Sequence, residues 1–487
     1  MTDIVFCNVP MVNTKAPFSA PAILKSVVEA NGYTSKTMDF NIESQIGNLK
    51  SFWQFGQGNA LTIQSAHKCA NKWAKQILYH RPKWVGISVF CYTCQIATEM
   101  LCIALKSIDK NIKIVLGGNG MGKGGINGDF SWPQNLLASK TIDAYIRSEA
   151  EKSIIELLRG NLDFPGINEN KNFDQLDNLD IFPHPNYSDY SLKQYPRNTL
   201  PITGSRGCVR QCTFCDIHTH WNKFVFRTGQ SICDEMRELS DIHQIYRFAF
   251  TDSLVNGSMK AYRDFIHALA KHNKSHQSIT WSGQFIARSH TQMTEEDWKM
   301  TSLSGAWELS IGVETGSDRV RNDDIKKKFT NEDLDFCVEM AHKYNIKIWF
   351  LMLIGYPTEH EQDFQDTMNL FTKYKKYKDI ILPNLGTTCA ILPRTPLFDF
   401  AQQNNFTMGK TENEWWWEQN PNLTFKERLR RRVVLGEHCK SLGYKLNDKT
   451  ELETMAYMWN NYKLNQYADL AKLRSDEVDS RNTQYYS

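Results

Sequence analysis

The chain has 487 residues, of which 41% are hydrophobic and 23% are charged, and its formal net charge is +3. This length can supply the cores of two or three domains, and the nearly neutral charge argues against a dedicated nucleic-acid or membrane surface. No run of about 18 apolar residues is present, and the apolar N-terminal stretch has no basic flank, so we expect neither a membrane span nor secretion.

Short apolar runs alternate with segments of helical periodicity over roughly the first 165 residues. We expect strands at residues 4–9, 34–40, 84–90 and 113–116, and helices at 20–31 and 96–108. Such alternation predicts a doubly wound parallel sheet, whose ligand binds beyond the carboxyl ends of the strands.

A glycine-rich turn that contains Gly117, Gly118, Gly120 and Gly122 follows the last of these strands. The pattern G-x-G-x-x-G is typical of dinucleotide binding, but that fingerprint follows the first strand of its domain, and this one does not. A nicotinamide cofactor is therefore a disfavoured alternative. Glycines at such positions also serve simply as turn residues.

Residues 161–200 mix asparagine, aspartate and proline without a persistent apolar period, which predicts a linker. We expect a first domain at 1–165, a linker at 166–196, a second domain at 197–400 and a helical C-terminal extension at 401–487.

Three cysteines, Cys208, Cys212 and Cys215, follow a short apolar run with the spacing C-x3-C-x2-C. Such a loop can bind three irons of a four-iron cluster and leave the fourth iron without a protein ligand. Zinc is an alternative because His218 and His220 are close, but no second Cys/His pair follows at the usual interval. Three buried structural cysteines are a further alternative, disfavoured because the loop is polar. The twelve irregularly spaced cysteines of the chain indicate a reducing compartment, and we expect the cytoplasm.

Alternation of strands and helices returns after residue 200. We expect a helix at 231–239 and six strands, one directly before the cysteine loop and the others at 246–252, 279–284, 307–314, 346–355 and 380–391.

The cysteine loop resembles the cluster loop of radical S-adenosylmethionine (SAM) enzymes. The shared features are the cysteine spacing, Phe214 directly before the last cysteine, and Thr-x-Ser-Arg-Gly-Cys at the first. In that family SAM chelates the open iron of a 4Fe-4S cluster, and one electron from the cluster cleaves SAM to a 5'-deoxyadenosyl radical. The resemblance implies a partial (βα)6 barrel of the TIM type with its site at the carboxyl ends of the strands. It also implies an electron donor such as flavodoxin or ferredoxin and a small-molecule or peptide substrate.

The same resemblance implies roles for residues at the strand ends. Asp252 would receive the SAM amino group, and Arg288 would pair with the SAM carboxylate, a task that suits a planar bidentate donor. Glu314 would reach the ribose or the amino group, and Gly355 would let the backbone approach the adenine. An acidic residue after a strand is also often a helix N-cap, and we expect Glu359 to cap the following helix.

The N-terminal region resembles the cobalamin-binding domain that precedes the radical domain in a large radical SAM subgroup. The resemblance rests on a Pro-rich loop at 10–21, the helix at 22–33, and the stretches 85–89 and 142–151. It implies that Ser88, Gly117 and Gly118 line a cobalamin site. The motif Asp-x-His-x-x-Gly, whose histidine ligates cobalt in many cobalamin proteins, is absent, as it often is in this subgroup. A degenerate domain without cobalamin is an alternative.

Cys91 and Cys94 form a C-x-x-C pair that could be a redox pair or bind a second cluster. Together with Cys7 and Cys69 they raise a methylthiotransferase alternative, in which the N-terminal domain carries an auxiliary cluster. Against it, no terminal RNA-binding barrel is evident, and free cysteines often serve as small buried apolar residues.

The resemblance thins beyond residue 396. The aromatic segment 414–418 and the basic segment 427–432 could contact a polyanion, but a helix with one solvated basic face packed by tryptophans is favoured. We expect the tail from residue 474 to fray.

The sequence therefore predicts an α/β protein with a Rossmann-like doubly wound sheet, a radical SAM barrel and a helical C-terminal region. The expected activity is reductive cleavage of SAM, with cobalamin-dependent methyl transfer to an unactivated carbon. The alternatives are a non-methylating or methylthiotransferase-like radical SAM enzyme and a non-enzymatic iron-sulfur electron carrier. A nucleic-acid partner is not expected.

Overall fold

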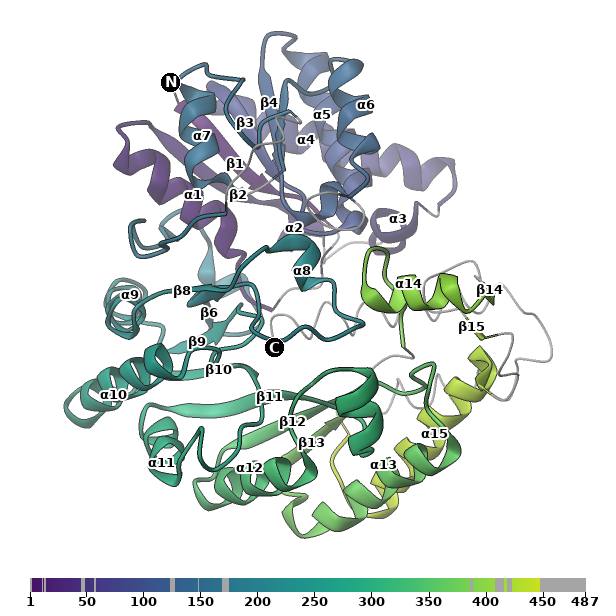
Figure 1. Ribbon diagram of the computed structural model, residues 1–487. Helices are drawn as coiled ribbons and strands as arrows, with labels where there is room; N and C mark the ends of the chain where they lie inside the picture. The colour runs from purple at the N-terminus through teal and green to yellow at the C-terminus, as the bar shows by residue number, and fades with distance from the viewer. Residues whose placement is uncertain are drawn as a thin grey trace. The chain divides into compact units, whose positions relative to one another are not determined.

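The computed structural model describes residues 2–10, 12, 15–44, 49–56, 58–122, 128–147, 149–168, 175–385, 389–407, 416–417 and 423–446. The chain forms two compact units with a boundary between Pro201 and Ile202 (Figure 1). No helix in these described stretches is long and apolar enough to cross a membrane. Trp415 and the tail from residue 474, both subjects of sequence predictions, lie outside the described residues.

The first unit is built on a five-stranded parallel sheet with the order β2-β1-β3-β4-β5. Its strands are β1 (Thr2–Asn8), β2 (Ser35–Asp39), β3 (Pro82–Ser88), β4 (Lys113–Gly117) and β5 (Ala144–Ile146). This order has its topological switch point between β1 and β3, which is where flavodoxin-like sheets bind their ligands. The predicted doubly wound sheet is confirmed.

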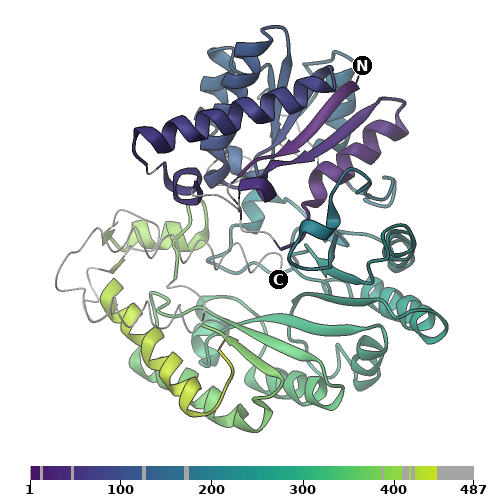
Figure 2. The ribbon, with the colours of Figure 1, turned by 180° about the vertical axis from the view of Figure 1, so that it is seen from behind.

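Apolar residues on successive positions of each strand pack on opposite faces of the sheet. In β1, Ile4 and Phe6 join one core cluster, whereas Val5 and Cys7 join another. Helices α1 (Ser19–Ala30) and α7 (Ala150–Leu158) cover the first face, and α4 (Ala60–Tyr79) and α5 (Gln95–Ile108) cover the second (Figures 1 and 2). Shorter helices are α2 (Phe40–Ser44), α3 (Lys50–Phe55) and α6 (Ser131–Ala138).

The described part of the predicted linker packs against the first unit. The Asp189 carboxylate lies 2.5 Å from Lys36 Nζ, and the hydroxyl of Tyr195 donates to the Asp39 carboxylate at 2.5 Å. Burial raises the pKa of Asp39 to about 6. This stretch has little regular secondary structure, yet its side chains complete the edge of the first sheet.

The second unit is built on a six-stranded sheet with the order β13-β12-β11-β10-β9-β6. Its strands are β6 (Leu200–Ile202), β9 (Arg247–Phe250), β10 (Thr280–Phe285), β11 (Ala306–Glu314), β12 (Lys347–Met352) and β13 (Ile381–Asn384). The pairs from β9 to β13 are parallel. The strands follow each other in sequence, as in a partial barrel, so the predicted fold class is confirmed.

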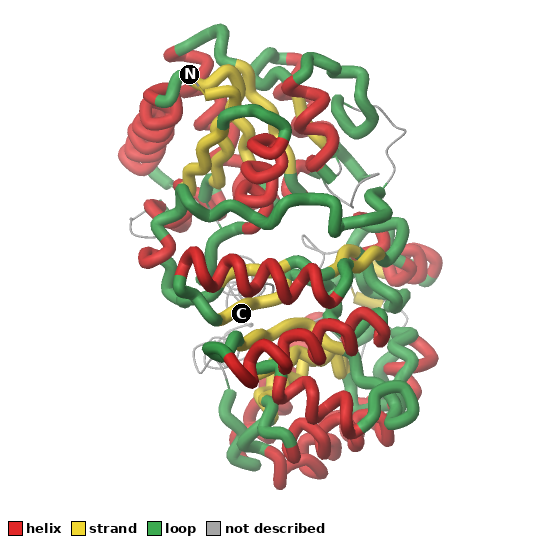
Figure 3. Tube along the Cα trace, turned by 90° about the vertical axis from the view of Figure 1, so that its left-hand side faces the viewer, coloured by secondary structure: helices red, strands yellow, loops and turns green. Residues whose placement is uncertain are grey.

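Helices alternate with these strands and form an outer layer over them (Figure 3). They are α9 (Gly229–His243), α10 (Met259–Ser275), α11 (Glu295–Leu303), α12 (Asn331–Lys343) and α13 (Glu361–Lys373). Threonine or serine side chains cap α9, α10, α11 and α12 at their amino ends, which satisfies N–H groups that have no partner inside the helix. The carboxyl ends of the strands therefore carry the loops that can form a site.

The C-terminal part contains α14 (Pro396–Gln403), the short pair β14 (Phe406–Thr407) and β15 (Trp416–Trp417), and α15 (Phe425–Ser441). The prediction of a solvated basic face at 427–432 is wrong. Arg428, Arg431 and Arg432 are at most 4% exposed. Arg431 pairs with Glu359 and Glu427, so its charge is satisfied inside the second unit.

We expect Asn41→Ala to destabilise the first unit. Asn41 is fully buried, and its amide group binds both backbone groups of Val12, with N–H to Oδ1 at 3.0 Å and Nδ2 to the carbonyl at 2.8 Å. Loss of these partners lowers the free energy of unfolding by about 1–3 kcal/mol in urea denaturation.

Asn71→Ala is the matched control, because Asn71 is exposed and its Nδ2 atom donates to the carbonyl of His67 in its own helix. It should change the free energy by less than about 0.5 kcal/mol. Equal effects of the two substitutions would contradict the role of Asn41.

Candidate functional site

A glycine with a left-handed backbone conformation directly precedes the first cysteine of the loop. Strand β7 (Ser205–Arg206) pairs with β8 (Val225–Phe226), and Gly207 follows with φ +85°. A Cβ atom at Gly207 would lie 2.4 Å from the carbonyl oxygen of Lys223. Only glycine fits this close approach in the left-handed region, so Gly207 fixes where Cys208 leaves the short ribbon.

Thr213 anchors the middle of the loop to three distant segments. Its N–H donates to the carbonyl of Ile325 at 3.1 Å, and its hydroxyl lies 2.9 Å from the carbonyl of Asp324 and 2.8 Å from the hydroxyl of Tyr356. Its own carbonyl accepts from Leu397 N–H at 2.9 Å. The loop is therefore held by the π-helical turn η4 (Val320–Asp324), the segment after β12 and the start of α14.

The three cysteine thiols form one electrostatically coupled group. Cys212 is buried, while Cys208 and Cys215 are half-buried. Burial raises the pKa of each thiol, and the charge of Cys212 adds to this effect at both neighbours. Iron offsets this cost because it binds the thiolates, so the donor set fits a cluster.

The histidines that suggest zinc have other partners. A ring nitrogen of His218, on the short helix α8 (Ile217–His220), bonds the carbonyl of Arg210, and His220 lies 3.6 Å from Asp216. Among the described residues, no three His, Cys, Asp or Glu side chains converge where one metal ion could bind. The ligands of a four-iron cluster bind different irons and need no such convergence.

Apolar side chains pack around the cysteines. Cys212, Phe214 and Cys215 belong to one core cluster, together with Tyr356, Cys389, Ile391 and Leu397. Leu397, at the start of α14, thus contributes to this packing. Such an environment excludes water and strengthens every electrostatic interaction inside it.

Asp252 lies just beyond the carboxyl end of β9 and binds the backbone that leads into the cysteine loop. Its carboxylate accepts from the N–H groups of Gly204 at 2.9 Å and Ser205 at 2.6 Å. Burial raises the pKa of Asp252 to about 7, although both N–H groups and Arg227 oppose the shift. The structure gives Asp252 this anchoring role, and its contact with SAM stays a prediction.

Arg288 lies in a positively charged environment. Its Nη2 atom donates to the carbonyls of Asn256 at 2.7 Å and Gly257 at 2.9 Å. Burial, together with the charges of Arg210 and Arg263, lowers the pKa of Arg288 to about 10. Arg210 belongs to the cysteine loop, and its Nε atom is buried without a hydrogen-bond partner in the described part of the chain. A carboxylate ligand would relieve this repulsion, which fits the predicted role of Arg288 and adds Arg210.

Glu314 forms a buried ion pair that sequence reasoning missed. Its carboxylate lies 2.6 Å from Lys327 Nζ, and the two side chains are 9% and 13% exposed. Glu314 has φ +67°, and a Cβ atom at Gly312 would lie 2.4 Å from Lys327 Nζ, so Gly312 leaves room for the pair. The pKa of Lys327 is raised despite burial, because Glu314 and the thiols of Cys212 and Cys215 favour the cation.

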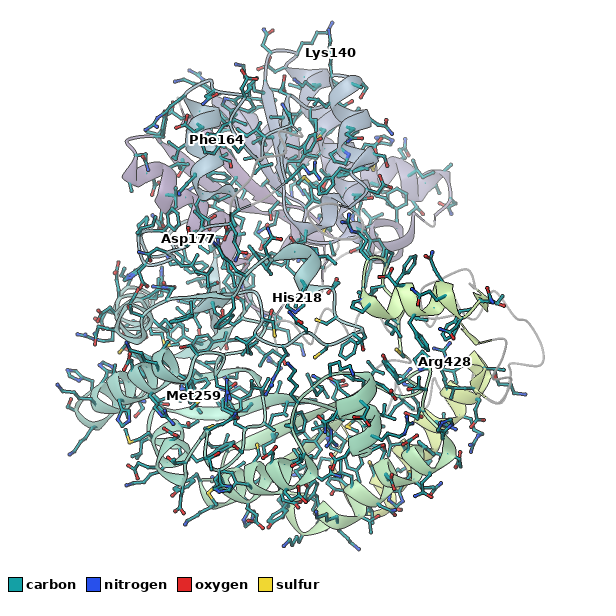
Figure 4. All side chains as sticks on the ribbon, viewed as in Figure 1. Lys140, Phe164, Asp177, His218, Met259 and Arg428 are labelled. Atoms are coloured by element: carbon teal, nitrogen blue, oxygen red, sulfur yellow. The ribbon has the colours of Figure 1, made fainter. Side chains whose placement is uncertain are left out.

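Gly355 and Glu359 connect β12 to the C-terminal helix. Gly355 has φ +77°, and a Cβ atom there would lie 2.3 Å from Arg428, a residue of α15 (Figure 4). The prediction that Glu359 caps the next helix is wrong, because His360 is the N-cap of α13. Glu359 instead pairs with Arg431 at 2.7 Å, and burial raises the pKa of Glu359 to about 7. Contact of Gly355 with adenine stays a prediction.

The three residues predicted to line a cobalamin site lie at or just beyond the carboxyl ends of β3 and β4 in the first sheet. Ser88 ends β3 and pairs with Asn8 of β1 and with Gly117 of β4. Gly118 follows with φ +105°, and a Cβ atom there would lie 2.5 Å from the carbonyl oxygen of Val89. A Cβ atom at Gly117 would meet nothing within 4 Å. Sheets of this kind bind their ligands at the carboxyl ends of the strands, where these residues lie. Their contact with a cofactor stays a prediction.

Residues 202–371 match the model of the Radical SAM superfamily. The chain is 26% identical over 195 residues to cytidylyl-2-hydroxyethylphosphonate methyltransferase of Streptomyces wedmorensis. The aligned region covers 37% of this chain and 35% of that protein. The chain spans about a third to a half of the length of curated relatives such as this one.

Two solved structures share the fold over nearly all of the chain. One is the radical SAM methyltransferase TsrM of Kitasatospora setae with cobalamin and a 4Fe-4S cluster bound, with TM-score 0.66, 14% identity and coverage of 99% of this chain and 100% of that chain. The other is the cobalamin-dependent SAM radical enzyme OxsB with aqua-cobalamin and SAM bound, with TM-score 0.65, 16% identity and coverage of 100% and 72%.

The cysteine loop, the partial barrel and the matched family together define the class. Residues 202–371, which contain the cysteine loop, belong to the radical SAM superfamily. Membership implies a 4Fe-4S cluster and SAM as cofactors.

We expect Asp252→Asn to change how stability depends on pH. The folded-state pKa of about 7 lies above the value near 3.9 of an unfolded aspartate, so the wild type loses stability relative to the variant as pH rises from 4 to 7. The difference reaches at most about 4 kcal/mol and is constant above pH 7. Urea unfolding at each pH measures it, and the contributions of Asp39 and Glu359 cancel between the two proteins.

Asp264→Asn, at an exposed position on α10, is the control and should change the free energy of unfolding by less than about 0.5 kcal/mol. A stability difference for Asp252→Asn that does not vary with pH would contradict the assignment of a raised pKa to Asp252.

We expect Lys327→Met to destabilise the second unit by about 3–5 kcal/mol, because it leaves the Glu314 carboxylate buried without its cation. The double variant Glu314→Gln/Lys327→Met should recover most of this loss in urea unfolding. The single variant should also lower the midpoint potential of the reconstituted cluster, since a nearby positive charge favours the reduced form.

Lys326→Met is the matched control, because Lys326 is the exposed neighbour. It should change stability by less than about 0.5 kcal/mol and leave the potential unchanged. A Lys327 variant that behaves like the Lys326 variant would show that the buried pair has no such role.

Proposed function

We propose that the protein is a cobalamin-dependent radical SAM methyltransferase that acts on an unactivated carbon of a small-molecule or peptide substrate. The observation that carries the proposal is the union in one chain of a radical SAM unit and a flavodoxin-like sheet. The whole-chain likeness of fold to TsrM and OxsB supports it, as does the methyltransferase relative.

When bound, the cluster and SAM supply reductive cleavage of the sulfonium, and cobalamin supplies a methyl carrier. Cys208, Cys212 and Cys215 would hold the cluster. Arg288 and Arg210 offer guanidinium groups to the SAM carboxylate, and a bidentate contact of this kind fixes orientation as well as charge. The buried cation of Lys327 would offset the negative charge of the thiolates and iron-sulfur core.

In the first unit, Ser88, Gly117 and Gly118 are the proposed contacts of cobalamin. An open space at Gly117 and a backbone turn that only glycine tolerates at Gly118 suit the close approach of a large planar ligand. With no Asp-x-His-x-x-Gly motif, the domain would hold cobalamin without a histidine ligand from that motif. A flavodoxin or ferredoxin is the proposed electron donor.

The methylthiotransferase alternative has less support in the arrangement of the cysteines. Cys7 is fully buried in β1, and burial raises its pKa well above the usual value. Cys94 is also fully buried, and its thiol lies beside that of Cys91. An auxiliary cluster would require these side chains to leave their packing.

We expect anaerobically reconstituted protein to bind cobalamin and to convert SAM. With dithionite or reduced flavodoxin, it should release S-adenosylhomocysteine and 5'-deoxyadenosine, which chromatography detects. The absorption spectrum of protein separated from free cobalamin should show a bound corrin. Cys212→Ala should abolish both products, because the cluster loses one of its three ligands.

Cys233→Ala is the control, because Cys233 is a buried cysteine of α9 outside the loop, and it should retain both products. Release of 5'-deoxyadenosine without a bound corrin would overturn the cobalamin proposal. Absence of both products from protein with an intact cluster would overturn the methyltransferase proposal as a whole.

A further inference from the structure

Cys91 and Cys94 form a close pair of thiols at the amino end of a helix. Strand β3 ends at Ser88, and the turn η1 (Tyr92–Cys94) leads directly into α5. The two Sγ atoms are 3.9 Å apart. Cys94 is fully buried, whereas Cys91 is half-buried. One cysteine of the pair is thus partly exposed, and the other is fully buried.

The surroundings of Cys91 stabilise a thiolate. The thiol of Cys94 and the hydroxyl of Thr93, 2.9 Å away, bond its sulfur, and N–H groups at the start of the helix add to them. These contacts lower the pKa of Cys91 to about 7. The bond to Cys91, together with burial, raises the pKa of Cys94 well above its usual value. This asymmetry is typical of C-x-x-C pairs in which the first cysteine attacks and the second resolves.

The backbone at Cys91 is held in place by the turn that follows β4. A Cβ atom at Gly120 would lie 2.3 Å from the carbonyl carbon of Cys91, so the two backbones touch. Gln95 Nε2 donates to the carbonyl of Gly120 at 2.7 Å and fastens the helix to the same turn. A disulfide has an S–S distance of about 2.05 Å. Because the backbone is held, the side chains of the two cysteines would have to move to reach this distance.

The pair begins three residues beyond Ser88, after the carboxyl end of β3. Strand β3 is one of the two strands that flank the topological switch point of the sheet. Sheets of this kind bind their ligands at the switch point. A change in the oxidation state of the pair would therefore alter a segment beside this ligand-binding edge.

We infer that Cys91 and Cys94 are a thiol–disulfide exchange site, separate from the cluster cysteines, whose reactant is a small disulfide of the glutathione type. This inference goes beyond the proposed function and does not depend on it. The Cys91 thiolate attacks one sulfur of the disulfide, forms a mixed disulfide and releases one thiolate. The Cys94 thiol then loses its proton and attacks Cys91, which forms the Cys91–Cys94 bond and releases the second thiolate. Two protein thiols are oxidised, and one disulfide is reduced to two thiols.

The test uses the full-length protein with its cluster, equilibrated anaerobically with mixtures of reduced and oxidised glutathione. The protein is then denatured in the presence of an alkylating reagent that blocks every free thiol, and trypsin releases the peptide 84–106, which contains Cys91, Cys94 and Cys102. Cys102 is fully buried, and burial raises its pKa, so it is an internal control. We expect an oxidised peptide in which Cys91 and Cys94 escape alkylation while Cys102 is alkylated. The oxidised fraction should rise with the proportion of oxidised glutathione.

Two matched variants separate the roles of the two thiols. Cys94→Ser should trap a stable glutathione adduct on Cys91, because the resolving thiol is missing. Cys91→Ser should reduce adduct formation on this peptide to below about one tenth, because Cys94 is buried. In the wild type, the rate of oxidation should reach half its maximum near pH 7.

A peptide that stays fully alkylated at every glutathione ratio would overturn the inference, as would equal oxidation of Cys102. The iron content of both variants should equal that of the wild type. A loss of iron from either variant would instead identify the pair as ligands of a second cluster and would also overturn the inference.

Discussion

The cysteine loop depends on one electrostatic constraint, which is that three thiols in an apolar shell can ionise only with a compensating charge nearby. Burial alone disfavours the charged form of each cysteine in the loop. The buried Lys327, paired with Glu314, places a positive charge near Cys212 and Cys215. The left-handed backbone at Glu314 and the missing side chain at Gly312 make this pair sterically possible. The cluster that we propose would therefore depend on the surrounding fold for its compensating charge.

The same principle of compensated buried charge extends to the C-terminal helix. Arg431 of α15 meets Glu359 from the loop after β12 and Glu427 from its own helix. Arg428 covers Gly355 and donates to the carbonyl of Cys389, a residue of the core around the cysteine loop. The C-terminal segment thus packs against the second unit through arginines whose charge alone would predict exposure to solvent. Removing one partner of such a pair costs more than the pair contributes, because the other charge stays buried.

Much of the fold could be predicted because local pattern and tertiary environment agree. Buried parallel strands such as β3 and β12 contain continuous apolar runs, and the spacing of the cysteines is a local motif. Helix α4 was missed although it has 20 residues, because its buried positions include the small residues Ala66, Ala70 and Ala74 among lysines. Lys327 and Arg210 were missed because their importance comes from contacts over long sequence separations. The prediction that residues 427–432 are solvated was wrong for a related reason. The carboxylates that pair with Arg431 include Glu359, which lies in a distant segment of the sequence.

The central claim is that Cys208, Cys212 and Cys215 bind a 4Fe-4S cluster with one iron open to SAM. Low-temperature electron paramagnetic resonance of the reduced, reconstituted protein tests it most directly. The account predicts the signal of a reduced 4Fe-4S cluster and a clear change in that signal when SAM is added. A cluster signal that SAM leaves unchanged, or that persists after all three cysteines are replaced by alanine, would contradict the account.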